Sequence, residues 1–240
     1  MKNKLWLRTL SLLLAVILCL QCGTYIVFAE DGETVEQTET AEQTEPVLVG
    51  EQTEKRTANE KYFMYSDQST VVAVYPEAVH YQDENGAWQD IDNRLSEDDT
   101  DGETELGNTA NAWKIKFAKK AKDGKLATLK YGDHTVKWYL SGADKTKATA
   151  LPEEETQSDD PYCLPGISSG TVYKDLLPDV DLEYRLIGDK IKENIILNSA
   201  DAPGAFTFVY ETGALEMQLQ DGVISLIDGE QTVLVLDAPV

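Results

Sequence analysis

The chain has 240 residues, with 43 Asp and Glu against 21 Lys and Arg and a formal net charge of −22 at pH 7. Such an acidic balance argues against nucleic acid as the general partner, because phosphate backbones attract basic surfaces. Two of the three cysteines fall within the first 22 residues, which leaves Cys163 alone. The sequence therefore predicts a fold held by its core without an internal disulfide.

Residues 1–29 have the pattern of a cleaved secretory signal peptide. Three basic residues precede an apolar run at 10–20, and a small-residue cleavage site follows at 27–29. The run is short for a membrane span, which needs roughly 18 apolar residues or more. We expect a secreted protein, extracellular or in the cell wall, with no membrane insertion after cleavage and a net charge near −25.

Residues 30–58 are rich in Glu, Thr and Gln. The motif "EQTE" occurs three times, starting at residues 36, 42 and 51, and no Lys or Arg precedes residue 55 in this segment. A segment of this composition buries too little apolar surface to offset the entropy of the chain. The sequence predicts a disordered acidic linker here.

Residues 59–240 predict an all-β domain, because short β-type runs alternate with turn residues at regular spacing and no amphipathic helix interrupts them. The expected fold is an antiparallel β-sandwich, either one large sandwich or two stacked small ones, which can continue beyond residue 240. Two polar segments, 96–108 and 151–163, are expected to be surface loops. The expected strands are 69–75, 78–82, 87–92, 112–118, 127–132, 135–141, 171–176, 180–187, 190–197, 205–211, 214–220, 223–228 and 232–237.

The stretch "YQDENGAWQDIDNRL" (81–95) predicts a hairpin around Asn85-Gly86. A two-residue type I′ turn would pair Tyr81 with Asp90 and would place Asp90 and Asp92 on the face of Trp88. A β-bulge near residue 89 is the alternative. An exposed Trp88 would make this face a sugar platform, whereas a buried Trp88 would leave the aspartates solvated or anchoring the turn.

Residues 114–147 contain ten lysines and three aspartates in an otherwise acidic chain. One interpretation is that the lysines complement acidic surface elsewhere in the fold; the other is contact with anionic wall polymers. The candidate binding lysines are Lys114, Lys116, Lys119 and Lys120. Alternation with Trp113, Ile115 and Phe117 predicts a strand with one apolar and one basic face.

A second hairpin is predicted over residues 180–197, with Gly188 at the first central position of a type II′ turn. In that register Glu193 lies opposite Tyr184 among apolar residues. A carboxylate in such a place needs a partner or a raised pKa. We interpret Glu193 as a structural buried carboxylate with an Arg, Lys or Tyr hydroxyl partner, and a general acid is the alternative.

Metal and cofactor motifs are missing from the sequence. Asp179, Asp181 and Glu183 recur on one strand face, which indicates a solvated surface, with a calcium or sugar contact as the alternative. The segment "DDTDGE" lacks the ordered ligands of a calcium loop, and His80 and His134 are the only histidines. The sequence therefore predicts no metal, no cofactor and no catalytic residues.

Two stretches, "YPEAVHYQDENGAWQDIDNRL" (75–95) and "VYKDLLPDVDLEYRLIGDKIKENIIL" (172–197), carry a family resemblance. Together they resemble the N-terminal β-rich region of large secreted, wall-associated proteins of Gram-positive bacteria, of the RHS/YD-repeat and polymorphic-toxin type. The resemblance covers roughly residues 60–240 and implies a surface protein. It supplies no catalytic residues for this region.

The expected function is a noncatalytic extracellular or cell-wall module, the leader region of a larger surface protein, in contact with anionic wall polymer or glycan and not with nucleic acid. One alternative is a carbohydrate-binding module that uses exposed aromatics, with Trp88, Trp113, Trp138 and Tyr81 as candidates, although Trp113 and Trp138 lie in alternating patterns typical of a core. A third interpretation, a glycan-cleaving enzyme, needs two carboxylates that converge across a groove. The sequence leaves the oligomeric state open.

Overall fold

The computed structural model describes residues 45–99, 105–121, 124–143, 146–151, 161–164 and 166–237. The chain divides into two compact units, Met1–Thr44 and Glu45–Val240, and the described residues all belong to the second. The predicted signal peptide lies outside the described residues. Apart from one 3-10 turn, the regular elements of the described residues are β-strands in antiparallel sheets, which confirms the predicted all-β, sandwich-like fold.

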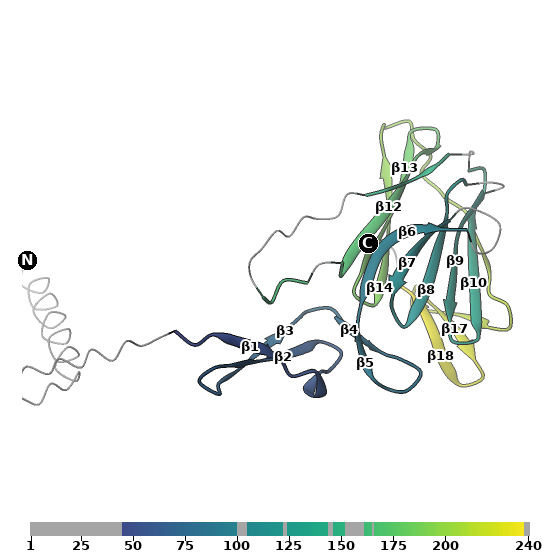
Figure 1. The fold of residues 1–240 in the computed structure, drawn as a ribbon. Coiled ribbons are helices and arrows are strands. Elements are labelled where there is room, and N and C mark those ends of the chain that lie inside the picture. Colours follow the sequence, from purple (N-terminus) through teal and green to yellow (C-terminus); the bar gives the residue numbers. More distant parts are fainter. Residues whose placement is uncertain are drawn as a thin grey trace, which may run out of the picture. The chain divides into compact units, whose positions relative to one another are not determined.

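Two sheets form the sandwich (Figure 1). The larger sheet has six strands in the order β15-β10-β9-β8-β7-β6, and the other has four in the order β11-β12-β13-β14. The strands of the larger sheet are β6 (Asp92–Asp98), β7 (Glu105–Ala110), β8 (Trp113–Ala118), β9 (Lys125–Tyr131), β10 (His134–Leu140) and β15 (Phe208–Glu211). Those of the smaller sheet are β11 (Ala148–Ala150), β12 (Ser168–Leu177), β13 (Val180–Ile187) and β14 (Lys190–Leu197).

Strand alternation builds the core between these two sheets. In β8 the apolar Trp113, Ile115 and Phe117 are buried, while Lys114 is exposed and Lys116 is half-buried. In β13 every second residue from Val180 to Leu186 is buried. Since side chains alternate across a strand, one face of each sheet supplies apolar groups to a single shared core.

Aromatic rings and their polar atoms connect the two sheets. Phe117 of β8 stacks on Tyr184 of β13 with ring centroids 5.1 Å apart. The buried Tyr173 hydroxyl donates to the carbonyls of Ala118 and Leu126, at 2.7 and 2.9 Å. Trp138 Nε1 donates to the Tyr184 hydroxyl at 2.9 Å. These bonds satisfy polar atoms that burial would otherwise leave unpaired.

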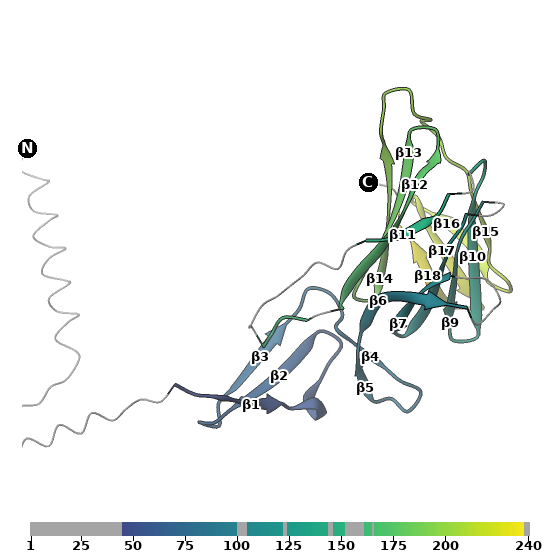
Figure 2. The ribbon, with the colours of Figure 1, turned by 45° about the horizontal axis from the view of Figure 1, so that its top comes forward.

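A three-stranded sheet, β16-β17-β18, adds to the same core. Its strands are β16 (Glu216–Gln220), β17 (Val223–Asp228) and β18 (Gln231–Leu236). Leu226 of β17 is 1% exposed and belongs to the core cluster, together with Leu215 just before β16. The outer strand β16 is exposed along its length. Figure 2 shows this sheet beside the six-stranded one.

The first part of the described chain forms two small sheets, which we name the N-terminal sheets. One contains β1 (Leu48–Glu51), β2 (Glu60–Tyr65) and β3 (Thr70–Val74), with the 3-10 turn η1 (Thr53–Lys55) between β1 and β2. The other is the hairpin of β4 (His80–Gln82) and β5 (Trp88–Asp90). Tyr162, in the segment before β12, contacts the first of these sheets through hydrogen bonds with Tyr65 and Tyr75.

Buried asparagines join the hairpin of β13 and β14 to the larger sheet. The Asn93 amide donates to the carbonyls of Ile167 and Gly188, at 2.9 and 2.8 Å. Asn111 donates to the same Gly188 carbonyl at 2.9 Å and to Asn93 Oδ1 at 3.0 Å. Gly188 has φ +55°, and a Cβ there would lie 2.6 Å from the carbonyl oxygen of Ala78, so the turn requires glycine. We name Asn93, Asn111 and Gly188 the carbonyl junction.

The register predicted for residues 180–197 is confirmed. Val180 pairs with Leu197, Tyr184 with Glu193 and Ile187 with Lys190. The positive φ of Gly188, with no positive φ at Asp189, agrees with a type II′ turn.

The loop predicted at 96–108 is wrong at both ends. Strand β6 runs to Asp98 and β7 begins at Glu105, and residues 100–104 between them lie outside the described part. These polar residues can lie in strands because neighbouring strands supply hydrogen-bond and ion-pair partners for their side chains. Glu105 is buried beside Lys125 at 3.0 Å, and the Asn108 side chain bonds to the backbone of Trp113 and Ile115. Of the loop predicted at 151–163, residues 152–160 lie outside the described part.

The boundary predicted at residue 58 also differs from the structure. Strand β1 pairs with β2, and η1 follows it, inside the segment expected to be a disordered linker. The reason is that Glu51 and Arg56, which look like solvated charges in the sequence, are partners in a charge cluster described below. The linker prediction for residues 30–44 lies outside the described residues. No helix of the described part is long and apolar enough to cross a membrane.

Candidate functional site

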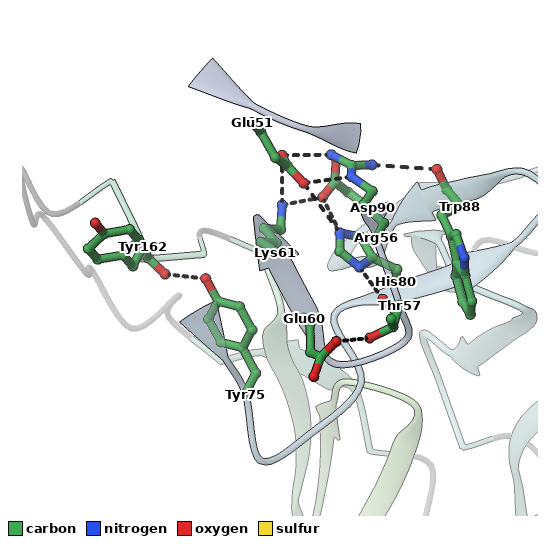
Figure 3. Close-up of polar contacts among 10 residues, drawn as sticks. All are labelled: Glu51, Arg56, Thr57, Glu60, Lys61, Tyr75, His80, Trp88, Asp90 and Tyr162. Carbon is green, nitrogen blue, oxygen red and sulfur yellow. Dashed lines mark hydrogen bonds and ion pairs between the residues drawn. The ribbon is translucent and has the colours of Figure 1, made fainter. Parts of the chain in front are cut away.

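In the described part of the chain, five ionisable side chains gather between the two N-terminal sheets (Figure 3). They are Glu51, Arg56, Lys61, His80 and Asp90, which we name the His80 cluster. Glu51 ends β1, Arg56 follows η1, Lys61 is in β2, His80 begins β4 and Asp90 ends β5. Five separate backbone segments therefore place these groups together.

Arg56 makes most of the contacts. Its Nε and Nη2 donate to the two carboxylate oxygens of Glu51 at 2.6 and 2.9 Å, a bidentate arrangement. Nη2 also donates to Asp90 Oδ2 at 3.1 Å, and Nη1 to the carbonyl of Trp88 at 3.4 Å. Since only 9% of the Arg56 side chain is exposed, its guanidinium is committed to these partners.

Lys61 completes the ionic pairing. Its Nζ lies 2.5 Å from Asp90 Oδ1 and 3.7 Å from Glu51 Oε2, and its side chain is also 9% exposed. Two cations thus face two carboxylates, and the formal charge of these four groups is zero. Asp90 is the one with the largest contact with solvent, because 56% of its side chain is exposed.

The His80 imidazole is fully buried beside these charges. Its Nδ1 lies 2.6 Å from the carbonyl of Thr57, and because a carbonyl can only accept, Nδ1 carries the proton of this bond. Its Nε2 lies 3.5 Å from Asp90 Oδ1 and 3.9 Å from Glu51 Oε1, and it has no hydrogen-bond partner among the described residues.

Opposing effects set the pKa values in the cluster. Burial would raise the pKa of Glu51 and of Asp90, but their hydrogen bonds to Arg56 and Lys61, with the charges of both cations, lower both pKa values overall. The pKa of Arg56 is raised, chiefly by its bond to Glu51. Burial lowers the pKa of His80, and the charges of Arg56 and Lys61 lower it further against the Thr57 bond. The cluster favours charged carboxylates and a neutral imidazole.

The geometry of the cluster is that of a closed ionic network. The donors of Arg56 and Lys61 bind carboxylates of the chain itself, and the imidazole presents no surface to solvent. In this conformation the cluster holds β1, β2, β4 and β5 together through ion pairs and hydrogen bonds. Among the described residues, no group of three or more His, Cys, Asp or Glu side chains could hold a metal ion.

The hairpin that supplies Asp90 has a register one residue away from the prediction. His80 pairs with Asp90, Tyr81 with Gln89 and Gln82 with Trp88. Gly86 has φ +77° while Asn85 has no positive φ, so the turn is not type I′. Asp83 stabilises a longer loop, because its carboxylate accepts from the amides of Asn85 and Ala87 at 2.9 and 3.0 Å.

This register separates the residues of the expected platform. Trp88 and Asp90 share a strand face with His80, whereas Tyr81 lies on the other face, opposite Gln89. Trp88 is half-buried. Asp92 belongs to the next strand, β6, where it pairs with the side chain and amide of Arg94. The buried Ile91 lies between Asp90, which ends β5, and Asp92, which begins β6. The four candidates therefore do not form one surface.

The candidate lysines have partners within the fold. Lys116 lies 3.2 Å from Asp98, and Lys119 forms an ion pair with Glu97, both partners in β6. Lys114 donates to the carbonyl of Thr109 at 2.5 Å, and burial lowers its pKa. Lys120 is exposed and forms a backbone bridge with Lys147. The ion pairs of Lys116 and Lys119 favour the interpretation that these two lysines complement acidic residues of β6 in the same sheet.

Glu193 has a tyrosine hydroxyl as its partner. The Tyr184 hydroxyl donates to Glu193 Oε2 at 2.5 Å, and burial of this carboxylate raises its pKa. Glu193 also helps to raise the pKa of Tyr210 to about 12, although burial is the larger cause. The residue as a whole is nonetheless exposed, because β14 is the edge strand of its sheet. Its carboxylate is still held by the Tyr184 hydroxyl.

Sequence reasoning did not find the His80 cluster. Of its members, only Asp90 is a candidate site residue in the sequence; Glu51 and Arg56 fall in the expected linker, Lys61 falls in the expected β domain without a role, and His80 enters only the argument about metal ligands. A usable signal is that Arg56 and Lys61 follow closely after the third EQTE repeat, where basic residues first appear in the acidic segment.

Comparisons with known proteins give relatives of one kind. The chain is 31% identical over 218 residues to a tRNA(Glu)-specific nuclease WapA of Bacillus subtilis subsp. natto. It is 30% identical over 221 residues to a tRNA3(Ser)-specific nuclease WapA of Bacillus spizizenii, and 30% identical over 218 residues to a tRNA nuclease WapA of Bacillus subtilis. These alignments cover 88–89% of this chain and 9% of each relative. No family model and no solved structure matches the chain.

These relatives support the resemblance to wall-associated proteins of the RHS type and confirm the expected secreted, extracellular or cell-wall location. They contradict three other expectations: a noncatalytic or carbohydrate-binding module, the absence of enzymatic activity, and the absence of a nucleic acid partner. The relatives are named as enzymes that act on tRNA. The chain spans 9% of the length of each relative, and its net charge of −22 describes these 240 residues alone, so it does not exclude a nucleic acid partner.

Proposed function

We propose that this chain is the N-terminal β-rich region of a secreted, wall-associated protein of the RHS/YD-repeat type, and that the protein to which it belongs is a nuclease that cleaves tRNA. The observation that carries this proposal is 30–31% identity to three tRNA nucleases. The identity extends over nearly nine-tenths of the chain, which a short shared motif would not produce.

The substrate class in this proposal is tRNA and not a particular tRNA. Two of the relatives carry different specificities in their names, for tRNA(Glu) and tRNA3(Ser), at nearly the same identity to this chain. Similarity in this region therefore does not follow tRNA choice. We expect the choice of tRNA to depend on residues outside the aligned 218–221 positions.

Purified protein tests the proposal directly. The protein encoded by the complete reading frame and the 240-residue chain are each incubated with a pool of total tRNA. Ribosomal RNA is the control substrate, and the ends of the cleaved RNA are sequenced. We expect the complete protein to cleave tRNA at defined positions and to spare ribosomal RNA. Absence of tRNA cleavage by both proteins would overturn the proposal.

The same assay locates the chemistry. A nuclease centre within this chain would need an acid-base group that reaches a phosphodiester. Of the two histidines, His80 is fully buried, whereas His134 keeps part of its surface and lies 3.6 Å from Asp228. If the chain alone cleaves tRNA, His134→Gln should reduce the rate and the matched His80→Gln should not. The reverse result would place the chemistry in the His80 cluster.

A further inference from the structure

The unpartnered nitrogen of His80 points to a second property of the cluster, independent of the proposed nuclease activity. With its proton on Nδ1, a neutral imidazole turns the lone pair of Nε2 toward Asp90 Oδ1 at 3.5 Å and Glu51 Oε1 at 3.9 Å. Lone pair and carboxylate oxygens face each other without a hydrogen between them. Buried polar atoms of this kind are rare, and each requires an explanation.

The charges around the imidazole come from every element packed on it. Glu51 faces it from β1, Arg56 and the Thr57 carbonyl from the segment after η1, Lys61 from β2, and Asp90 from β5. Trp88, also in β5, adds an uncharged ring with its centroid 6.4 Å away.

Both carboxylates already have their cations. Glu51 takes the bidentate guanidinium and Asp90 takes Lys61 and one nitrogen of Arg56. With a neutral imidazole the formal charge of the cluster is zero. A proton on Nε2 would point toward Asp90 Oδ1 and Glu51 Oε1, but Arg56 and Lys61 already neutralise these two carboxylates. The cluster would therefore gain a net positive charge around an imidazole that has no contact with solvent, and the cost of this burial opposes the attraction of the carboxylates.

We propose that His80 is a proton-sensitive lock, which holds the β4–β5 hairpin against the sheet of β1, β2 and β3 while its imidazole is neutral and releases it when the imidazole is protonated. The imidazole connects the two sheets, because its Nδ1 binds the Thr57 carbonyl while its backbone belongs to β4. Two backbone bonds from Val79 and His80 to the Ala58 carbonyl run beside it. We name these contacts of Val79 and His80 with Thr57 and Ala58 the seam, and protonation of His80 weakens them.

The direction of the pH effect follows from linkage. The pKa of His80 is lowered from its ordinary value of 6.5, so in the interval just below 6.5 the unfolded or opened hairpin binds a proton that the closed one does not. Stability of the seam is complete above 6.5 and is lost as the pH falls through the lowered pKa. Glu51 and Asp90 also have lowered pKa values, but from ordinary values of 4.5 and 3.8, so their loss occurs in more acidic solution.

Hydrogen exchange at two pH values tests the lock. Amide protection of β2, β4 and β5 is measured at about pH 7.5 and about pH 5.5, corrected for the intrinsic pH dependence of exchange, with β12 and β13 as internal reference. We expect protection of the N-terminal sheets to fall about threefold to tenfold at the lower pH, while the reference strands stay unchanged. Equal protection at both pH values would overturn the proposal.

The two histidines provide a matched pair of variants. His80→Gln keeps a donor for the Thr57 carbonyl and cannot be protonated in this range, so protection of the N-terminal sheets should lose its pH dependence. His134→Gln removes the histidine at the start of β10 and should keep the dependence of the unaltered chain. If His80→Gln retains the full dependence, another group is responsible and the assignment to His80 is wrong.

Titration by NMR gives a test that does not depend on folding of a variant. The imidazole resonances of His80 in the unaltered chain should titrate below 6.5, and its Nδ1 should carry the proton at neutral pH. A His80 that titrates at or above the value of a free histidine would show that protonation strengthens the seam, and would overturn the lock.

Discussion

The sandwich and the N-terminal sheets use different means of cohesion. Between its sheets, the sandwich buries an apolar cluster that includes Phe117, Tyr173 and Tyr184, and its polar atoms are satisfied inside that cluster. The N-terminal sheets bury few large apolar side chains, Phe63 and Val79 among them, and are joined by the His80 cluster. Apolar burial is insensitive to pH, whereas ionic pairing depends on protonation. The same chain should therefore lose these two regions under different conditions.

Removal of a core ring should give the largest effect. Phe117 is fully buried and stacks on Tyr184, so Phe117→Ala removes apolar contact and leaves a cavity between the sheets. We expect a loss of about 3–5 kcal/mol in the free energy of unfolding, measured by urea denaturation. The matched control is Leu219→Ala, since Leu219 is 71% exposed, with a change of less than about 0.5 kcal/mol. Similar losses in both variants would contradict a single core between the sheets.

Next in size is the carbonyl junction. Asn93→Ala leaves the carbonyls of Ile167 and Gly188 without its donor in a buried site, and we expect a loss of about 2–3 kcal/mol by the same measurement. Asn198→Ala, just after β14, keeps the backbone bond from Asn198 to Asp179 and serves as the control, with little change. An Asn93 variant as stable as this control would mean that water replaces the lost amide.

Breaking the ionic network should act locally. Arg56→Met removes the guanidinium and leaves Glu51 buried without its bidentate partner, which we expect to cost about 1–3 kcal/mol in β1 and β2. Hydrogen exchange should show the loss there and not in β12 or β13. Arg94→Met is the control, because Arg94 is half exposed and its pair with Asp92 lies at the surface. Loss spread evenly over both regions would indicate that the two fold as one cooperative unit.

Glu193 should give the smallest effect, with the opposite sign. Its pKa is raised above 4.5, so the folded chain holds a proton that the unfolded chain has released, and stability falls as the pH rises through this interval. Glu193→Gln keeps an acceptor for the Tyr184 hydroxyl and removes the charge, which should leave stability at pH 7 equal or slightly higher. Thermal unfolding at about pH 5 and about pH 7 measures it. Marked destabilisation at neutral pH would show that the carboxylate charge is needed.

Sequence reasoning succeeded where local pattern determines structure. The alternation in β8 and β13 and the glycine at residue 188 fixed strand, face and register, because a side-chain period of two and a two-residue turn leave few alternatives. The hairpin at 83–87 differed by one residue, because Asp83 caps the amides of Asn85 and Ala87 and lengthens the loop. Such a side-chain cap competes with the turn that the Asn-Gly pair favours.

The site could not be predicted because its members are far apart in sequence. Glu51 and Asp90 are separated by three strands, and no spacing rule brings them to one imidazole. The prediction of a loop at 96–108 failed for the same reason. Glu105 and Asn108 are residue types common in loops, and only their partners across the sheet show that they belong to a strand. Charge in a sequence predicts solvation by default, and the exceptions depend on tertiary contacts.

The carbonyl junction has a consequence for the order in which the chain folds. Gly188 lies 95 positions after Asn93 and 77 after Asn111, so the bonds to its carbonyl close very long loops. Closing such loops is entropically costly, and contacts of this separation are slow to form. In a chain that emerges with its N-terminus first, Asn93 must wait for the turn at 188 before its amide is satisfied. The first half of the molecule should therefore remain open to chaperones and proteases until most of the second half has emerged.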